Sequence, residues 1–278
     1  MSVSTLDTAG EALRRGDPPP PQGERSHVLV LGGGLLGAAV ARRVAADGAS
    51  VVVASRTPRA HPGLWRRADL AGVPPSGLFV PGAHVVWAVA VPDADTSLPG
   101  TVLPRLVDHA LRMGVSGVTV CAPAGEGTPA AAALARAVRT LSDPRVRVVR
   151  LPPLFGTDDR IAWPLVHAVR DRGVARVPRR MPPSWPLWVE DAARAVMQAP
   201  VGGCVLRGPQ RLEAVDVARA VAEALEGRWG WRLFGGREGA PLLAGQQDAP
   251  DDWDDARFGA RTTLGTWLAR LPVVRRRR

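Results

Sequence analysis

Residues 27–56 read HVLVLGGGLLGAAVARRVAADGASVVVASR, and this stretch decides the fold class of the chain. It contains an apolar strand, a glycine turn, an Ala-rich helix and a second apolar strand. Gly32, Gly34 and Gly37 have the G-x-G-x-x-G spacing of a dinucleotide-binding turn. Gly32 allows the tight turn out of the strand, and Gly34, which has no Cβ, lets the backbone approach a pyrophosphate. Gly37 lets the helix pack closely against the strand.

The helix that follows the turn predicts an anion site. Its first residues, Leu35 and Leu36, present free backbone N–H groups at the positive end of the helix dipole, where phosphates bind. The strands predicted at Val28–Leu31 and Val51–Val53 supply the context that the motif requires. The alternative is a glycine-rich turn in an α/β domain that binds no ligand.

Composition restricts the class of protein. With 278 residues, 46% of them hydrophobic, the chain can bury one large core or two modest ones. It has no run of about 18 apolar residues, and residues 1–21 lack the apolar segment of a secretory signal. Cys121 and Cys204 are too few for a disulfide framework, and no Cys/His cluster has metal-ligand spacing. We therefore expect a cytoplasmic protein with no membrane span and no metal.

The charge of the chain comes from an unusual set of residues. All 36 of the Lys+Arg residues are arginine, and the net charge is +10. Tyrosine and asparagine are also absent, which a GC-rich genome explains because the codons for Lys, Tyr and Asn are rich in A and T. The arginines are dispersed, so we expect no specific nucleic-acid partner. The dense run Arg275–Arg278 is interpreted as a solvated tail.

Strands and helices alternate between residues 27 and 150. Apolar runs predict strands at 28–31, 50–54, 84–91, 117–121 and 146–149, with a further short one near 67–70. Helices are predicted at 35–46, 101–113 and 128–141. This alternation predicts an α/β fold of the Rossmann type, in which a doubly wound parallel sheet carries helices on both faces.

The chain divides into four predicted segments. These are a disordered Pro-rich arm at 1–25, a Rossmann domain at 26–150, a smaller mixed C-terminal substrate region at 151–270 packed on it, and a basic tail at 271–278. In the C-terminal region the sequence predicts helices at 161–172, 190–199 and 212–226, and short strands at 187–189 and 204–206.

Three later stretches carry a family resemblance. VRVVRLPPLFGTDD at 146–159 is similar to a strand ending in an Arg-Pro…Tyr-Gly loop, with Phe155 and Gly156 where Tyr-Gly is usual. WVEDAARAVMQA at 188–199 resembles a Val-Asp-Asp…Ala-Arg-Ala element, and the segment at 207–227 resembles a Gly-Pro-Glu…helix element. With the glycine turn, in this order, they resemble the extended short-chain dehydrogenase/reductase family of the NAD(P)-dependent epimerase/dehydratase type. The resemblance covers residues 27–227.

The resemblance implies further residues of the cofactor site. Gly32, Gly34 and Gly37, with Leu35 and Leu36 at the helix N-terminus, would hold the pyrophosphate. The strand end at Ala88, Val89 and Ala90 would flank the nicotinamide ribose. Asp69 resembles the acidic residue that contacts adenine, with an ordinary loop carboxylate as the alternative.

The end of the second strand predicts the choice of cofactor. NAD binding commonly uses an acid about 20 residues past the turn for the ribose 2′-OH. Residues 49–68 contain no Asp or Glu, and the strand ends in Ser55 and Arg56, with Arg59 nearby. Because arginine pairs bidentately with phosphate and serine can donate a hydrogen bond, we expect NADP(H) in preference to NAD(H). A solvated Arg56 with no ligand is the alternative.

The catalytic residues of the family are missing. The family uses Tyr-x-x-x-Lys on the helix after the fifth strand, with a Ser or Thr just past that strand. The chain contains no tyrosine and no lysine, and residues 120–127 contain no Ser or Thr. Arginine cannot replace the lysine in proton relay because its pKa is too high. The remaining candidate acids, each with a structural alternative, are Cys121, His109, Glu126 and Asp191.

Two hypotheses of different classes follow. The first is an NADP(H)-dependent oxidoreductase of the atypical branch, acting on a small carbonyl or nucleotide-sugar-like substrate. The second is a catalytically silent NADP(H)-binding sensor or scaffold. An apolar cleft lined by Trp87, Phe155 and Trp185 would favour the first, and a filled one the second. Substrate identity, catalytic residues and oligomeric state stay open.

Overall fold

The structure is a computed structural model that describes residues 27–58, 61–72, 75, 77–89, 95–157, 159, 162–178, 183–232 and 260–271. The predicted arm at 1–25, Arg59, Ala90 and the tail after Leu271 lie outside the described residues.

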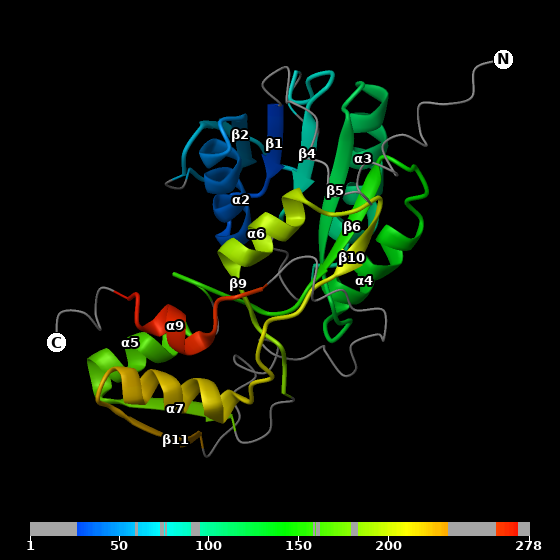
Figure 1. The fold of residues 1–278 in the computed structure, drawn as a ribbon. Helices are drawn as coiled ribbons and strands as arrows, with labels where there is room; N and C mark the ends of the chain where they lie inside the picture. Colours follow the sequence, from blue (N-terminus) through cyan, green and yellow to red (C-terminus); the bar gives the residue numbers. More distant parts are fainter. Residues whose placement is uncertain are drawn as a thin grey trace, which may run out of the picture.

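A seven-stranded sheet forms the centre of the larger half of the molecule (Figure 1). Its strand order is β10-β6-β5-β4-β1-β2-β3, and each neighbouring pair is parallel. The strands are β1 His27–Leu31, β2 Ser50–Ser55, β3 Leu64–Arg67, β4 His84–Trp87, β5 Gly117–Pro123, β6 Val146–Leu151 and β10 Gly202–Val205. The chain reverses direction across the sheet between β1 and β4, and ligands of such sheets bind beyond the strand ends at this switch point.

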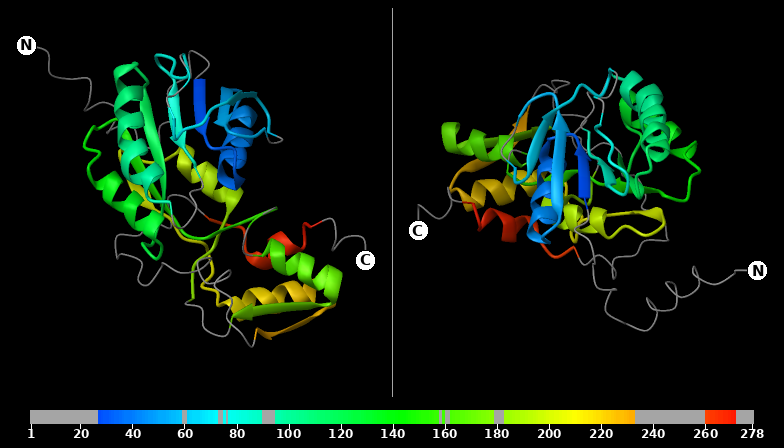
Figure 2. Two further views of the ribbon diagram at one scale, coloured as in Figure 1. Left: turned by 180° about the vertical axis from the view of Figure 1, so that it is seen from behind. Right: turned by 90° about the horizontal axis from the view of Figure 1, so that it is seen from above.

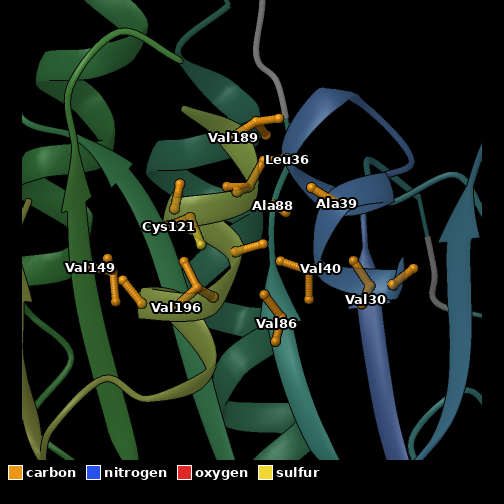
Figure 3. Close-up of a cluster of buried hydrophobic side chains, with 14 of the residues drawn as sticks. Val30, Leu36, Ala39, Val40, Val86, Ala88, Cys121, Val149, Val189 and Val196 are labelled. Carbon is orange, nitrogen blue, oxygen red and sulfur yellow. The ribbon is translucent and has the colours of Figure 1, made fainter. Parts of the chain in front are cut away.

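Helices cover both faces of the sheet, as the alternation predicted. On one face α2 (Leu35–Ala46) packs with α6 (Val189–Met197), and their buried side chains share one apolar cluster with β1, β2, β4, β5 and β6 (Figure 3). On the other face a π-helical turn, η1 (Leu98–Val102), leads into α3 (Leu103–Arg112), which shares a second cluster with α4 (Pro129–Arg139) (Figure 2). Because both faces are covered, the central strands are nearly continuous apolar runs.

A smaller lobe follows the sheet in sequence and lies beside it (Figures 1 and 2). It contains β8 (Val174–Pro178) paired with β11 (Arg228–Arg232), and the helices α5 (Trp163–Arg172), α7 (Ala214–Ala224) and α9 (Leu264–Leu268). These helices share a third apolar cluster with the lobe's strand β8. Two short strands, β7 (Leu154–Phe155) and β9 (Leu187–Trp188), pair with each other. The first lies where the chain leaves β6 for the lobe, and the second lies where it leaves the lobe for α6.

The predicted fold class is confirmed, and several boundaries need correction. Helix α2 has the predicted limits, and Thr128 caps α4 by accepting a hydrogen bond from the Ala131 N–H at 3.1 Å. The strand predicted near 67–70 is β3 at Leu64–Arg67, because its register is set by pairing with β2 after the turn at Gly63. The strand predicted at 84–91 ends at Trp87, opposite the last residue of β1, since the glycine turn removes its partner.

The segment after residue 150 does not stay in the smaller lobe. It returns to the larger half as α6 on the sheet face and β10 beside β6. The Rossmann layer is therefore built from two parts of the sequence. The chain passes between this layer and the smaller lobe after β6, before α6 and after β10.

Candidate dinucleotide-binding site

The glycine turn between β1 and α2 has the conformation that the motif predicts. Gly32 has φ of +104°, and a Cβ built on it would stand 2.6 Å from the Ala88 carbonyl oxygen. A Cβ on Gly37 would stand 1.8 Å from the carbonyl oxygen of Gly32. Both positions therefore require glycine, the first for its backbone and close contact with Ala88 and the second for helix packing.

Gly34 differs from the other two, because a Cβ built on it would meet no atom within 4 Å among the residues that the structure describes. It is the N-cap of α2 and has no side chain to satisfy the first N–H groups of the helix. The first helical hydrogen bond is donated by Ala38 to the Gly34 carbonyl at 2.9 Å, so the N–H groups of Leu35 and Leu36 precede it. Open space beside free donors at a positive helix end fits a phosphate group.

The side chains of Leu35 and Leu36 have packing roles. Leu36 is buried in the cluster between α2 and α6, where Figure 3 shows it close to Ala88 and Val189. A Cβ on Gly156 would lie 3.4 Å from Leu35 Cδ1 and 2.8 Å from a methyl of Val189, so the loop after β7 touches the start of α2. These two residues can therefore contact a phosphate only through their backbone.

The end of β2 lies beside the turn. A Cβ on Gly33 would stand 3.0 Å from Ser55 Oγ. The Ser55 hydroxyl donates to the Thr57 carbonyl at 2.7 Å and accepts from the Trp65 indole N–H at 3.0 Å. The next residue, Arg56, is exposed and forms no hydrogen bond or ion pair with any residue that the structure describes.

The remaining predicted cofactor residues border the same edge of the sheet. Ala88 continues from β4 and donates its N–H to the Leu31 carbonyl at 2.8 Å, and Val89 follows it. Asp69 is exposed in the loop after β3, where its carboxylate accepts the Ala71 N–H at 3.2 Å. This contact shapes the loop and matches the alternative interpretation of Asp69 as a loop carboxylate.

Helix α4 follows β5, and the sequence resemblance implies a catalytic pair on the helix at this position. It begins after β5 at the same sheet edge, and residues 129–135 read PAAAALA, without an ionisable side chain. Its sheet-facing residues, including Ala130 and Leu134, are buried. Within the described residues, α4 therefore offers no acid or base to that edge until Arg136.

Each of the four candidate acids is explained by packing or pairing. Burial, with a smaller contribution from nearby Cys204, raises the pKa of Cys121 to about 12, so it remains an inert thiol. His109 is exposed on α3 and meets the Phe79 ring edge-on. Glu126 is exposed and ion-paired with Arg139 at 3.1 Å.

Asp191 holds the C-terminal segment. It is buried in the first turn of α6, and its carboxylate accepts the N–H groups of Arg261 at 3.2 Å and Thr262 at 3.0 Å. Arg194 donates to its other oxygen at 2.9 Å. A carboxylate with these partners is a structural anchor that ties residues 260–271 to the sheet layer.

Trp87, Phe155 and Trp185, whose cleft was to discriminate the two hypotheses, do not line one common cleft. Trp87 is fully buried in the cluster under α3 and α4, whereas Phe155 is buried in the smaller lobe against Trp188 and Trp267. Trp185 is half-buried with the Arg207 guanidinium 4.8 Å above its ring. The strand period places Trp87 on the face opposite α2, a consequence that the apolar run alone did not reveal.

Sequence reasoning also missed two residues near the site. Trp65 contacts Ser55 from the neighbouring strand. Buried Asp159 accepts the N–H groups of Gly156 at 2.8 Å and Ala162 at 2.6 Å, which fixes the loop after β7 and the start of α5. The position of an Asp shortly before Trp163-Pro164 is a capping signal that was available in the sequence.

Comparison with known proteins places this geometry in a fold family. No protein-family profile matches the sequence, and no curated protein sequence is similar to it. Among solved structures, MoeE5 in complex with UDP-glucose and NAD is similar with a TM-score of 0.68 and 19% identity, covering 91% of this chain and 99% of that one.

Two further solved structures agree. The UDP-glucose 4-epimerase of Thermus thermophilus, in complex with NAD, has a TM-score of 0.70 and 16% identity over 90% of this chain and 99% of that one. The Bordetella bronchiseptica enzyme WbmG, in complex with NAD and UDP, has a TM-score of 0.69 and 14% identity over 90% of this chain and 94% of that one. The chain therefore shares its overall fold with these three solved structures.

Membrane spans and metal clusters do not occur in the part of the chain that the structure describes. It contains no helix that is both long and apolar enough to cross a bilayer. In the same residues, no three His, Cys, Asp or Glu side chains gather as metal ligands do.

Proposed function

We propose that this chain binds a nicotinamide dinucleotide, NADP(H) in preference to NAD(H), with its pyrophosphate on the turn from Gly32 to Gly37. The open position at Gly34 beside the free N–H groups of α2 is the observation that carries the proposal. Gly32 and Gly37 are required by the protein itself, whereas nothing in the described protein requires Gly34 to lack a Cβ. A ligand that approaches the backbone there explains the glycine.

Arg56 supports the preference for NADP(H). Its guanidinium is exposed beside the turn, and it has no partner among the described residues. A ribose 2′-phosphate is a matching anion, and no acidic residue between 49 and 68 would accept a ribose 2′-OH instead. The three similar structures are complexes with NAD, so the binding preference is the point to measure.

We further infer that the bound dinucleotide serves as a sensed or structural ligand. When bound, a nicotinamide supplies hydride chemistry, and the protein must then supply orientation and a proton. In this chain α4 lacks ionisable side chains over 129–135, Cys121 stays protonated, and Glu126 and Asp191 are engaged by cationic side chains. The absence of tyrosine and lysine argues especially against nucleotide-sugar epimerisation.

A second candidate is an NADP(H)-dependent oxidoreductase acting on a small carbonyl or nucleotide-sugar-like substrate. The coverage of the structural match favours it, because 91% of this chain aligns with MoeE5 and the aligned part therefore includes the C-terminal lobe. In that case water or Glu126 would deliver the proton. Loss of NADPH absorbance with a panel of aldehydes, ketones and enones, above the rate without protein, would establish this candidate in place of the silent one.

Gly34→Ala tests the binding site. The backbone at Gly34 (φ −72°, ψ −167°) is accessible to alanine, and its Cβ meets open space, so unfolding free energy is expected to change by less than about 1 kcal/mol. NADPH affinity, followed by nicotinamide fluorescence, is expected to fall at least about tenfold, because the methyl occupies the space for the pyrophosphate.

Gly265→Ala is the matched control, since its Cβ also meets open space but lies in α9 of the smaller lobe. It is expected to leave NADPH affinity unchanged. Equal affinity in wild type and Gly34→Ala, or no binding of either NADPH or NADH to the wild type, would refute the proposed site.

A further inference from the structure

The edge strand β3 presents side chains to the dinucleotide turn. Because β3 pairs in register with β2, Trp65 lies opposite Val53 and Arg67 lies opposite Ser55. Partners in a parallel pair leave the sheet on the same face, and side chains alternate along a strand. Trp65, Arg67 and Ser55 therefore share the face that α2 covers, whereas Arg66 points to the opposite face and donates to the Gly77 carbonyl at 2.8 Å.

Trp65 fixes the turn from which Arg56 projects. Its indole N–H donates to Ser55 Oγ at 3.0 Å, and the Ser55 hydroxyl donates to the Thr57 carbonyl at 2.7 Å. This chain of two hydrogen bonds occupies the serine proton. Ser55 thus stabilises the turn through Thr57, and in this arrangement it does not direct a donor outward.

Two arginines remain available on either side of Ser55. Arg56 and Arg67 are both exposed, and within the described part of the chain neither forms a hydrogen bond or an ion pair. The nearest acid in sequence, Asp69, is exposed in the following loop and accepts the Ala71 N–H. Neighbouring strands are about 4.8 Å apart, so two flexible arginine side chains from adjacent strand ends can reach one anion.

We propose that Arg67 is a second guanidinium ligand for the 2′-phosphate of NADP(H), beside Arg56, and that Trp65 is a positioning residue that acts through Ser55. This inference rests on the proposed function, since it assumes a dinucleotide on the glycine turn. It assigns the choice between NADP(H) and NAD(H) to β3 as well as to the end of β2. Two guanidinium groups match the oxygens and charge of a phosphate monoester and gain nothing from a ribose hydroxyl.

Calorimetric titration with NADPH, NADH and 2′,5′-ADP tests this inference without any enzymatic turnover. Arg67→Gln is expected to weaken NADPH and 2′,5′-ADP about tenfold or more and to change NADH less than about twofold, because only the first two carry the 2′-phosphate. Trp65→Phe keeps most of the ring but removes the N–H donor. It is expected to weaken NADPH about threefold, with NADH affinity and melting temperature unchanged.

Arg105→Gln is the matched control, since Arg105 is an exposed arginine on α3, on the other face of the sheet. It is expected to leave all three affinities within about twofold of the wild type, so that a general loss of positive charge is separated from a lost ligand.

The outcomes separate this inference from the proposed function. If the wild type binds neither NADPH nor NADH, the proposed function fails and this inference fails with it. If the wild type prefers NADPH and Arg67→Gln keeps that preference, the function stands and Arg67 is not a ligand. If Arg67→Gln weakens NADPH and NADH equally, its role is not 2′-phosphate recognition and the inference is overturned.

Discussion

The glycine turn after β1 and helix α4 after β5 begin at the same edge of one parallel sheet, yet they differ in what they retain. The turn keeps each backbone feature that a dinucleotide site needs, including the positive φ of Gly32 and the open position at Gly34. Helix α4 keeps its cap and its apolar face but has no ionisable side chain over residues 129–135. The backbone geometry of a dinucleotide-binding turn is therefore present in this molecule without ionisable side chains at the start of the helix that follows β5.

The two elements differ in how far the protein's own packing restricts their residues. A glycine turn is constrained by the protein's own packing, since Gly37 is required whether or not a ligand binds. Catalytic side chains carry no such constraint, because alanine and leucine fill the same helix face with no strain. Two buried acids near this edge accept backbone N–H groups. Asp159 fixes the loop after β7, and Asp191 ties residues 260–271 to the sheet layer.

The largest expected effect separates the two roles of glycine within the turn. Gly37→Ala is expected to destabilise the protein by about 4 kcal/mol or more, because its Cβ would lie 1.8 Å from a backbone oxygen that cannot move aside. Chemical unfolding followed by circular dichroism measures this. A Gly37→Ala protein as stable as Gly34→Ala would show that packing does not constrain the turn. The contrast between the glycine turn and helix α4 would then be wrong.

A second effect concerns the amino ends of the sheet strands, at the opposite end from the glycine turn. Burial, together with nearby Arg147, lowers the pKa of His84 from 6.5 to about 4. Its Nε2 lies 2.9 Å from the hydroxyl of buried Thr119. The neutral form is favoured in the folded state, so this contribution to stability is complete above pH 6.5 and is lost as pH falls from 6.5 to about 4.

The corresponding loss in the free energy of unfolding between pH 6.5 and about 4 is about 3 kcal/mol. His84→Gln is expected to flatten the dependence of unfolding free energy on pH in this range. His109→Gln, at an exposed position, is the control. NADPH affinity at pH 7 should be equal in both variants, because His84 begins β4 at the end remote from the glycine turn. A His84→Gln protein that keeps the wild-type pH profile would assign the acid sensitivity to another group.

The smallest expected effect addresses whether the edge near α4 does chemistry at all. Glu126→Gln removes an exposed ion pair with Arg139, so unfolding free energy should change by less than about 0.5 kcal/mol. NADPH affinity should not change. If the wild type oxidises NADPH with a carbonyl substrate and Glu126→Gln abolishes that turnover, Glu126 is the proton donor. The sheet edge at the start of α4 is then a catalytic site.

Local sequence predicted much of this molecule. The glycine spacing predicted the turn, the start of α2 and its contact with the strand, because those features depend on residues within about one helical turn of each other. Thr128 and Pro129 predicted the start of α4 for the same reason. The sequence also placed Arg56 directly after the second strand, and in the structure it follows β2 and is exposed.

Pairing between distant segments explains what was missed. The predicted limits of β3 and β4 were wrong because a strand lasts only as long as its neighbour, and the neighbours end at Ser55 and Leu31. The sequence left open whether Trp87 lines a cleft, and its position in the strand period buries it under α3.

The sequence by itself determined the class of fold, the glycine turn and the absence of a Tyr/Lys pair, since these follow from residue identity and short-range spacing. Only the tertiary structure decided that Trp65 and Arg67 lie beside Ser55, that α6 and β10 complete the Rossmann layer, and that Asp191 anchors residues 260–271. Those contacts join residues from ten to 148 positions apart, and they exist only after the sheet has brought its strands into register.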